Sequence, residues 1–451
     1  MTMADVDLAA AARQVLDANW MGHATRPSPR LYPHQWSWDS AFMAMGQATH
    51  DPARAQQELR SLFAAQWSNG LVPHIVFSEG QGRYFPGPDF WQSPRCPYAP
   101  RRPLTSGIVQ PPVHAISAWR VFRQLPDADE GRAFLAELLP RLAAWHAYLY
   151  RERADEHGLV EIWHPWESGM DNSPLWDEAL ARIEPAPGEV PPYERIDLDY
   201  ADVTHRPTDR EYDRYVYLVA LMREAAYLPD RIRPRLPFAV QDVLFNALLV
   251  RADRDLAHIA REVGADPRPF EEWADWTATG IDARLWDEAR GLYLDFDVRA
   301  GRAIDVRSGG GFAPLLAGVP DEVRARRLVE TLDRFAVAHD GEGLLVPSLD
   351  LDDPRFEPAR YWRGPVWPVV QWVVQAGLEE YGFRSRAARV RAGLTGLVDR
   401  SGFWEHYDPT SGRANGGEQF AWTAAIVLDV LQAGSGDRPA GEPTIPDGSG
   451  T

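Results

Sequence analysis

Residues 36–67 read WSWDSAFMAMGQATHDPARAQQELRSLFAAQW, and they predict two helices joined by a short link. Apolar residues recur with the 3.6-residue period of a helix over 38–49 and again over 52–67. Between these runs, Asp51 followed by Pro52 is a helix-start signal. An aspartate caps the free N–H groups of a first turn, and proline fits the first helical position. The stretch therefore predicts a helical hairpin.

Helical periodicity continues along most of the chain. Ser173 followed by Pro174 is a second start signal, and Pro111 and Pro112 lie in the predicted first turn of another helix. Strand signals are short: GLYLDFDV at 291–298, followed by RAGRAIDV, predicts a small hairpin, and FWEHYD followed by RANGG predicts a second one. Beyond the first stretch, helices are expected near 5–20, 111–124, 131–151, 174–183, 211–228, 236–263, 268–286, 321–337, 365–381, 384–399 and 418–433.

These elements predict an all-α fold in one domain, residues 1–433. Twelve helices in six hairpins that close into a single (α/α)6 barrel account for a domain of this size, with the short β-hairpins as insertions. A stack of helical repeats is the alternative, although the sequence shows no repeat of fixed period. The final segment, 434–451, is rich in glycine, proline and serine and poor in large apolar residues, which predicts a disordered tail.

The composition excludes several classes of protein. The net charge of −18 argues against nucleic acid and membranes as partners, because both are bound through basic patches. All 47 basic residues are arginines, so the lysine of a Schiff-base, pyridoxal-phosphate or P-loop enzyme is missing. Cys96 is the only cysteine and the histidines do not cluster, so we expect no disulfide, no metal site and no cofactor. The sequence shows neither a signal peptide nor a membrane-spanning run, which predicts a cytoplasmic protein and leaves a homo-oligomer open.

Many of the 18 tryptophans lie in loop-like stretches beside acids, prolines and glycines. This pattern favours a sugar-binding surface, where flat apolar rings face the C–H groups of a pyranose; the alternative is that the rings pack helix ends. Four such stretches lead directly into predicted helices. If these helices form the inner ring of a barrel, their first turns converge at one mouth. The four stretches are WSWDSAF (36–42), HPWESGMDNSP (164–174), YWRGPVWP (361–368) and NGGEQFAW (415–422).

Two acids lie four residues apart in HPWESGMDNSP, Glu167 and Asp171. Ser173 is the better helix cap, because Pro174 then takes the first helical position. Asp171 is thereby free for other work, and Glu167 can support the loop by accepting backbone N–H bonds. From the residues alone, the alternative stays open that both acids merely stabilise the positive end of a helix.

A third acid, Glu405, lies in the hairpin-like FWEHYD. Strand alternation puts Phe403, Glu405 and Tyr407 on one face, so the acid lies between two aromatic rings. An exposed or arginine-paired glutamate is the alternative interpretation. Glu418 in GGEQF is a rival candidate, and it is equally interpreted as an acid in the first turn of a helix.

Arginines and tyrosines recur in THRPTDREYDRY, residues 204–215. Arg206, Arg210 and Arg214 accompany Tyr212, and one such arginine can hold a substrate carboxylate through two hydrogen bonds. The alternative is an ordinary charged helix face, in which these arginines pair with the neighbouring acids.

Together, these motifs resemble the bacterial glucosylglycerate and mannosylglycerate hydrolases of glycoside hydrolase family 63. The resemblance runs from Tyr32 to Leu431, nearly the whole chain, and the order of its motifs is specific. ESGMDN by itself also resembles trehalases and related glucosidases. The motifs are YPHQWSWDSAF, LVPHIVF, YFPGP, LTSGIVQPPVHA, HPWESGMDNSP, RPTDREYDRY, YWRGPVWP and FWEHYDP with the later QFAWTAA.

The resemblance implies an (α/α)6 barrel and inverting hydrolysis of the α-glycosidic bond of mannosylglycerate or glucosylglycerate, a small anionic glycoside. It implies that Asp171 is the general acid and Glu405 the general base. It favours Glu405 over Glu418 as the base, because some relatives carry glutamine at the latter position. Carboxyl groups with these roles stand roughly 6.5–9.5 Å apart, to leave room for a water.

The other residues carried over from the family's motifs are expected to contact the substrate. A sugar epimerase or isomerase, which needs histidine acid–base pairs at the mouth, and a non-catalytic sugar-binding protein are the alternatives. The contacts expected for the sugar are Trp36, Trp38, Asp39 and Gln110; for the glycerate they are Tyr84, Arg206, Tyr212, Tyr361 and Trp362; the remaining candidate substrate-binding residues are Tyr32, Glu167, Gly169, Trp367 and Glu418.

Overall fold

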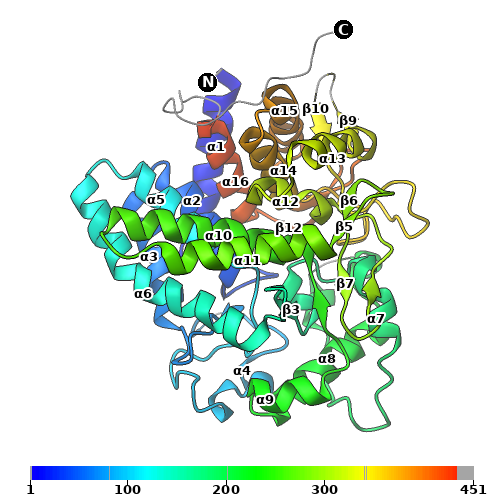
Figure 1. Ribbon diagram of the computed structural model, residues 1–451. Helices are drawn as coiled ribbons and strands as arrows, with labels where there is room; N and C mark the ends of the chain where they lie inside the picture. Colours follow the sequence, from blue (N-terminus) through cyan, green and yellow to red (C-terminus); the bar gives the residue numbers. More distant parts are fainter. Residues whose placement is uncertain (1–2, 81, 201, 340, 342, 434–451) are drawn as a thin grey trace.

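The computed structural model describes residues 3–80, 82–200, 202–339, 341 and 343–433, and this part of the chain is mainly helical (Figure 1). The segment 434–451, for which the sequence predicts a disordered tail, lies outside the described residues. The helices are α1 (Met3–Asn19), α2 (Ser37–Ala48), α3 (Pro52–Ala64), α4 (Pro88–Trp91), α5 (His114–Gln124), α6 (Ala128–Arg153), α7 (Asp177–Ala181), α8 (Asp209–Glu224), α9 (Pro229–Ile232), α10 (Val243–Glu262), α11 (Arg268–Arg284), α12 (Pro314–Ala317), α13 (Glu322–Phe335), α14 (Pro368–Glu380), α15 (Arg384–Ser401) and α16 (Ala421–Ala433).

The first hairpin forms as the sequence predicts. Asp51 caps α3 by accepting a hydrogen bond from the Arg54 backbone N–H, and Pro52 takes the first helical position. α2 and α3 pack against each other. Every residue of α2 is buried, whereas α3 buries only one stripe. A helix that is buried on all sides belongs inside the molecule, with α3 between it and solvent.

Six helices contact one another in a closed order: α2, α5, α10, α12, α14, α16 and then α2 again. Outside them, α3 packs on α2, α6 on α5, α11 on α10, α15 on α14 and α1 on α16. Figure 1 shows α10 and α11 lying side by side across the middle of the molecule. Five of the six helices thus have a second helix packed on them, and α12 has none among these contacts.

The strands are short and antiparallel. Both hairpins predicted from the sequence form, β7 with β8 and β11 with β12. The strands are β1 (Gln35–Trp36) with β2 (Ile75–Val76), β5 (Trp286–Asp287) with β6 (Leu292–Tyr293), β9 (Val337–His339) with β10 (Gly343–Leu345), β11 (Trp404–Tyr407) with β12 (Ala414–Glu418), and a four-stranded sheet ordered β3 (Glu161–Ile162), β4 (Val240–Gln241), β7 (Phe296–Asp297), β8 (Arg302–Ala303).

Several helix boundaries differ from the prediction. The helix predicted over 236–263 begins only at Val243, after strand β4. Pro111 and Pro112 are not in a first turn: α5 begins only at His114, with Val113 as its N-cap, and Pro112 disfavours the α conformation in Pro111 before it. The helix predicted over 174–183 is a 3₁₀ turn followed by the five-residue α7. The one predicted over 418–433 begins at Ala421, since strand β12 extends to Glu418.

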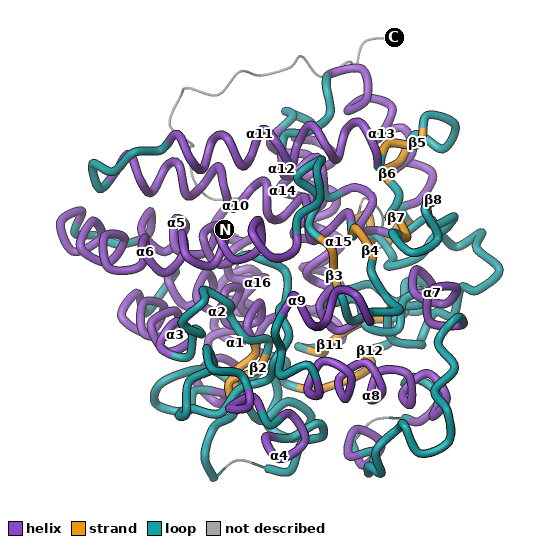
Figure 2. Tube along the Cα trace, turned by 60° about the horizontal axis from the view of Figure 1, so that its bottom comes forward, coloured by secondary structure: helices purple, strands orange, loops and turns teal. Residues whose placement is uncertain are grey.

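Long loops and the short helices α4 and α9 cover one end of the molecule, together with α8. This end is at the bottom of Figure 1 and comes forward in Figure 2. No helix in the described ranges is both long and apolar enough to span a membrane.

Candidate active site

Loops from four distant parts of the sequence meet in one pocket, called here the inner pocket. They are the segments that lead into α2, α7, α14 and α16, as the sequence predicts, although α7 is too short to belong to the closed order of helices. The inner pocket is lined mainly by aromatic rings with three carboxyl groups among them. Its residues are Tyr32, Trp36, Trp38, Asp39, Gln110, Gly169, Asp171, Tyr361, Trp362, Trp367, Glu405, Phe420 and Trp422.

A second pocket adjoins the first and is called here the outer pocket. It contains Arg206, with two further charged side chains and several aromatic rings around it. Its residues are Leu31, Tyr32, Tyr84, Phe85, Trp166, Asp171, Ile196, Asp197, Tyr200, Arg206, Pro207, Tyr212 and Tyr361.

Three residues line both pockets: Tyr32, Asp171 and Tyr361. Glu405 lines only the inner pocket, and Arg206 lines only the outer one. A ligand that fills both pockets therefore passes Asp171 at their boundary. Its inner part faces Glu405 and its outer part faces the Arg206 guanidinium.

The turn that carries Asp171 is fixed by a glycine and a cap. Gly169 has φ +73°, and a Cβ there would lie 2.5 Å from the Trp38 ring, so only glycine allows this approach. Downstream, Ser173 accepts a hydrogen bond from the Leu175 backbone N–H, which is the cap expected from the sequence. The Asp171 carboxyl is thus free of capping duty, while its backbone oxygen accepts a hydrogen bond from the Tyr215 hydroxyl at 2.9 Å.

Glu405 is buried and held by hydrogen bonds to both carboxylate oxygens. Its Oε1 accepts from the Tyr32 hydroxyl at 2.9 Å, and its Oε2 accepts from the Gly417 backbone N–H at 3.0 Å. A Cβ on Gly416, whose φ is +78°, would lie 2.3 Å from Glu405 Oε2, so a side chain there would displace the carboxylate. These contacts suit an ionised acceptor in a fixed orientation.

The simple strand alternation expected around Glu405 is interrupted. The pairing of β11 with β12 shifts register between Trp404 and His406, and Glu405, His406 and Tyr407 are all buried. His406 packs its ring on Trp367, with centroids 4.8 Å apart. The irregular register allows successive residues to be buried, which a flat strand with one wet face does not.

The surroundings of the two acids raise the pKa of both. Burial and the nearby Glu405 charge raise the pKa of Asp171 to about 7, against the opposing charge of Arg206. Burial also raises the pKa of Glu405, while Arg206 and the hydrogen bonds from Gly417 and Tyr32 work in the other direction. Asp171 is therefore protonated in an appreciable fraction of molecules near neutral pH, as a proton donor must be.

Arg206 lies in a cage of aromatic and acidic groups. Its guanidinium carbon is 4.5 Å from the centre of the Tyr361 ring, its Nη1 donates to the Tyr32 hydroxyl at 3.4 Å, and its Nε donates to Asp197 at 3.2 Å. Arg206 is 9% exposed, and it lines the outer pocket. By contrast, Arg210 is exposed, which agrees with the alternative interpretation that it belongs to an ordinary charged helix face.

Glu167 does not line either pocket. It is fully buried and accepts hydrogen bonds from the backbone N–H groups of Trp163 and Val109, which is the supporting role expected of it. It also accepts two hydrogen bonds from the buried Arg153, at 2.9 and 3.0 Å. The sequence also predicted that Glu167 contacts the substrate. Its buried position does not support such a contact, because its neighbours Trp166 and Asp171 line the outer pocket and Glu167 does not.

The variant Glu167→Gln is expected to lose about 3–5 kcal/mol of unfolding free energy, because it leaves the Arg153 charge buried without its counter-charge. Urea unfolding followed by tryptophan fluorescence measures this. Glu178→Gln is the control, because Glu178 pairs with Arg302 where both side chains are about two-thirds exposed. That variant is expected to lose less than about 1 kcal/mol. Equal losses of unfolding free energy in the two variants would contradict a stabilising role of the buried Glu167–Arg153 ion pair.

Glu418 also lies outside both pockets. Its side chain is half exposed and pairs with Arg30 at 3.1 Å on the surface. It points away because the bulge between Trp404 and His406 carries Glu405 inward while Glu418 ends strand β12. This position supports neither a substrate contact for Glu418 within the two pockets nor a role as a rival to Glu405.

Several lining residues were not predicted from the sequence. Phe420 and Trp422 belong to the NGGEQFAW stretch, whose place before a helix was a usable signal. Ile196, Asp197 and Tyr200 come from a segment without a recognisable motif, and only the fold brings them to Arg206.

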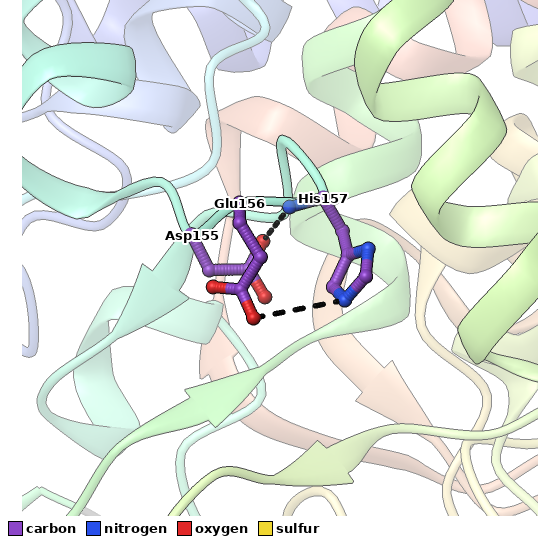
Figure 3. Close-up of side chains that lie close together, drawn as sticks. All are labelled: Asp155, Glu156 and His157. Carbon is purple, nitrogen blue, oxygen red and sulfur yellow. Dashed lines mark hydrogen bonds and ion pairs between the residues drawn. The ribbon is translucent and has the colours of Figure 1, made fainter.

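One group of side chains has the composition of a metal site, Asp155, Glu156 and His157 (Figure 3). Both oxygens of Asp155 already accept two hydrogen bonds each. The donors are the His157 and Leu159 backbone N–H groups for Oδ1 and the Gln241 and Arg284 side chains for Oδ2. Glu156 and His157 are exposed. The hydrogen bonds account for the position of Asp155, and none of the three residues lines either pocket.

Comparison with known proteins identifies the family. Residues 32–423 match the model of the mannosylglycerate hydrolase MGH1-like glycoside hydrolase domain. A mannosylglycerate hydrolase of Rubrobacter radiotolerans is 48% identical, over 95% of this chain and 97% of its own. A glucosylglycerate hydrolase of Mycolicibacterium hassiacum is 40% identical, over 94% and 97% of the two chains.

A solved structure agrees with these relatives. The family 63 mannosylglycerate hydrolase of Thermus thermophilus, in complex with Tris and D-glycerate, superposes with a TM-score of 0.87 at 45% identity. The match covers 94% of this chain and 99% of that one. The protein therefore belongs to the mannosylglycerate hydrolase MGH1-like glycoside hydrolases, within glycoside hydrolase family 63.

Proposed function

We propose that this glycoside hydrolase cleaves the α-glycosidic bond of mannosylglycerate, glucosylglycerate or both, with inversion at the anomeric carbon. The observation that carries the proposal is the position of Asp171. It lies at the boundary between an aromatic pocket with a second acid and a pocket with a buried arginine. A hexose in the inner pocket and a glycerate in the outer one would bring the bond between them beside this carboxyl group.

The two acids divide the chemistry. Asp171 gives its proton to the glycosidic oxygen as the bond to the anomeric carbon breaks, so glycerate leaves with a hydroxyl group. A water attacks the same carbon from the opposite face and loses its proton to Glu405. Hexose of inverted configuration and glycerate are the products, and Asp171 and Glu405 then exchange their proton states with solvent.

The carboxylate of the leaving glycerate needs a cation in a protein whose net charge is −18. Arg206 supplies it: Asp197 occupies Nε and Tyr32 contacts Nη1. The rest of the guanidinium fork remains for a two-bond contact with a carboxylate. Tyr84 and Tyr212 line the same pocket and close it around the small aglycone.

The sugar is proposed to lie against Trp36, Trp38 and the other rings of the inner pocket. Asp39 and Gln110 are the polar groups there that can bind its hydroxyls. Gln110 is fixed for this by accepting the Trp38 backbone N–H at 3.3 Å.

An (α/α)6 barrel is the architecture we propose around this site. The closed order of contacts through six helices supports it, as does the second helix that packs on most of them. In such a barrel, the first turns of α2, α14 and α16 face one mouth, which accounts for the convergence of their preceding loops.

The two alternative functions, a sugar epimerase or isomerase and a non-catalytic sugar-binding protein, receive less support. An epimerase or isomerase that works through histidines needs them at the mouth, yet neither pocket is lined by a histidine from the described residues. A non-catalytic binder has no use for two buried acids with raised pKa values beside the same ligand.

The proposal is tested by incubating the protein separately with mannosylglycerate and glucosylglycerate and measuring free hexose and glycerate. Equal amounts of both products are expected, and proton NMR in the first minutes is expected to show the β-anomer of the released hexose. Release of the α-anomer would contradict inversion. Conversion without free glycerate would favour an isomerase, and binding without turnover would favour a non-catalytic protein.

Replacement of Arg206 separates recognition of the aglycone from chemistry. For Arg206→Ala, KM for glycosylglycerate is expected to rise by about ten- to a hundredfold, because charge-assisted hydrogen bonds to the carboxylate are lost. For a neutral aryl glycoside the rise is expected to be several times smaller. Arg210→Ala is the control, because that arginine is exposed on the same segment. Equal rises for the two substrates would remove Arg206 from the carboxylate site.

A further inference from the structure

A line of buried polar side chains runs from the outer helices toward the first turn of α2. On α10, Asp253 lies 2.7 Å from His146 Nδ1 of α6 and accepts a hydrogen bond from the Tyr150 hydroxyl, also at 2.7 Å. At the other end, Ser37 Oγ of α2 lies 2.9 Å from His114 Nε2 of α5. All five side chains are buried.

The line is interrupted between the two histidines. Three buried nitrogens there have no hydrogen-bond partner in the described part of the chain: His114 Nδ1, His146 Nε2 and Trp145 Nε1. None of the three side chains has any exposed surface.

The three side chains are neighbours. Trp145 precedes His146 in α6, and the ring of His114 is 6.3 Å from that of Trp145. The proximity of His146 also contributes to a lowered pKa of His114. Three unpaired buried polar atoms on neighbouring side chains are costly, and proteins usually satisfy such atoms with an internal water that has two to four polar partners.

We propose that one internal water binds His114, Trp145 and His146, and that His114 acts through Ser37 as a positioning residue for the sugar-binding turn of α2. The water donates its two protons to His114 Nδ1 and His146 Nε2 and accepts the Trp145 Nε1–H. One molecule thus satisfies all three atoms.

This arrangement requires opposite tautomers in the two histidines. His146 donates its Nδ1–H to the Asp253 carboxylate, which leaves Nε2 as an acceptor. His114 donates its Nε2–H to Ser37 Oγ, which leaves Nδ1 as an acceptor. Burial lowers the pKa of His114 to about 3, so its ring stays neutral at ordinary pH.

Ser37 connects this line of polar side chains to the inner pocket. It lies between Trp36 and Trp38 and is followed within two residues by Asp39, and these three neighbours line the inner pocket. Its backbone N–H is fixed by the His74 carbonyl at 3.0 Å. His114 and the water complete this fixation from the α5 and α6 side.

The water and the tautomers are tested without any substrate. In the full chain labelled with ¹⁵N-histidine, NMR is expected to show an Nε2–H ring and an Nδ1–H ring, assigned through Ser37→Ala and Asp253→Asn. The Nε2–H ring, which belongs to His114, is expected to stay unchanged between about pH 5 and pH 8, because burial lowers the pKa of His114 to about 3. A crystal structure is expected to show an oxygen within about 3.2 Å of the three nitrogens. Identical tautomers, or an empty site, would overturn the proposal.

The positioning role rests on the proposed function and is tested by kinetics. Ser37→Ala is expected to lower kcat/KM for glycosylglycerate by about threefold to tenfold, mainly through KM, and to change the His114 signals. Ser117→Ala is the matched control. Its buried hydroxyl joins the same two helices by donating to the Ala41 carbonyl at 2.7 Å, without the histidines.

The control is expected to lower the unfolding temperature as much as Ser37→Ala does while changing kcat/KM by less than about twofold. Equal kinetic losses in the two variants would make Ser37 merely structural and overturn the positioning role. If the wild-type protein releases no hexose, the proposed function fails, and the NMR result still decides on the water.

Discussion

Asp171→Asn is expected to lower kcat for glycosylglycerate by about 10²–10⁴-fold, because the amide cannot give a proton to the glycosidic oxygen. The shape of the side chain is kept, so the unfolding temperature is expected to change little. A substrate whose leaving group needs no proton, such as a dinitrophenyl glycoside, is expected to lose far less. Initial rates with both substrates measure the difference.

The pH dependence gives a second readout of the same residue. In the proposed mechanism, the wild-type reaction needs Asp171 protonated and Glu405 ionised. Activity is therefore expected to fall above about pH 7, where Asp171 loses its proton, and to fall again in acid as Glu405 gains one. In Asp171→Asn, with the dinitrophenyl glycoside, the alkaline limb is expected to vanish.

Asp177→Asn is the control for this variant. Asp177 follows on the same segment, pairs with Arg363 and lines neither pocket. It is expected to keep kcat and both limbs of the pH profile. Wild-type turnover of glycosylglycerate by Asp171→Asn would refute the assignment of the general acid.

Glu405→Gln is expected to be at least as damaging, with a loss of about 10²–10⁴-fold in kcat, because the attacking water then has no base. A good leaving group does not replace a base, so the dinitrophenyl glycoside is expected to lose as much as glycosylglycerate. This contrast with Asp171→Asn distinguishes the two roles by experiment.

The residual activity of Glu405→Gln carries further information. The Glu405 charge raises the pKa of Asp171, so removing it is expected to move the alkaline limb to lower pH. Glu418→Gln is the control, because that side chain pairs with Arg30 outside both pockets. If the alkaline limb of the pH profile stays at its wild-type pH, the two acids do not interact. If Glu405→Gln hydrolyses the dinitrophenyl glycoside at the wild-type rate, Glu405 is not the base.

Local signals in the sequence were reliable where the cause of the structure is local. The cap of Asp51 with Pro52, and that of Ser173 with Pro174, formed because a side chain two or three residues away satisfies the first N–H groups of a helix. The boundary predicted at Pro111 was wrong, since Pro112 disfavours the α conformation in the residue before it.

Part of the candidate site was likewise predictable from local sequence signals, and part was decided only by the fold. Loop stretches with tryptophans and acids before helices predicted which segments meet, and most of the residues predicted for the site line one of the two pockets. Glu167 and Glu418 do not. Their residue type and spacing resemble those of Asp171 and Glu405, and only the buried Arg153 and the bulge in β11 separate them.

By itself, the sequence determined most of the long helices, the caps at Asp51 and Ser173, the two β-hairpins and the absence of lysine chemistry, because these depend on neighbours within a few residues or on composition. The tertiary structure alone decided that Asp171 borders both pockets, that Glu405 faces inward, and that Arg206 lies within reach of each. Burial and charge set the pKa of Asp171, and both come from residues far away in the chain. A proton donor is therefore made by the fold, while the sequence supplies the carboxyl group.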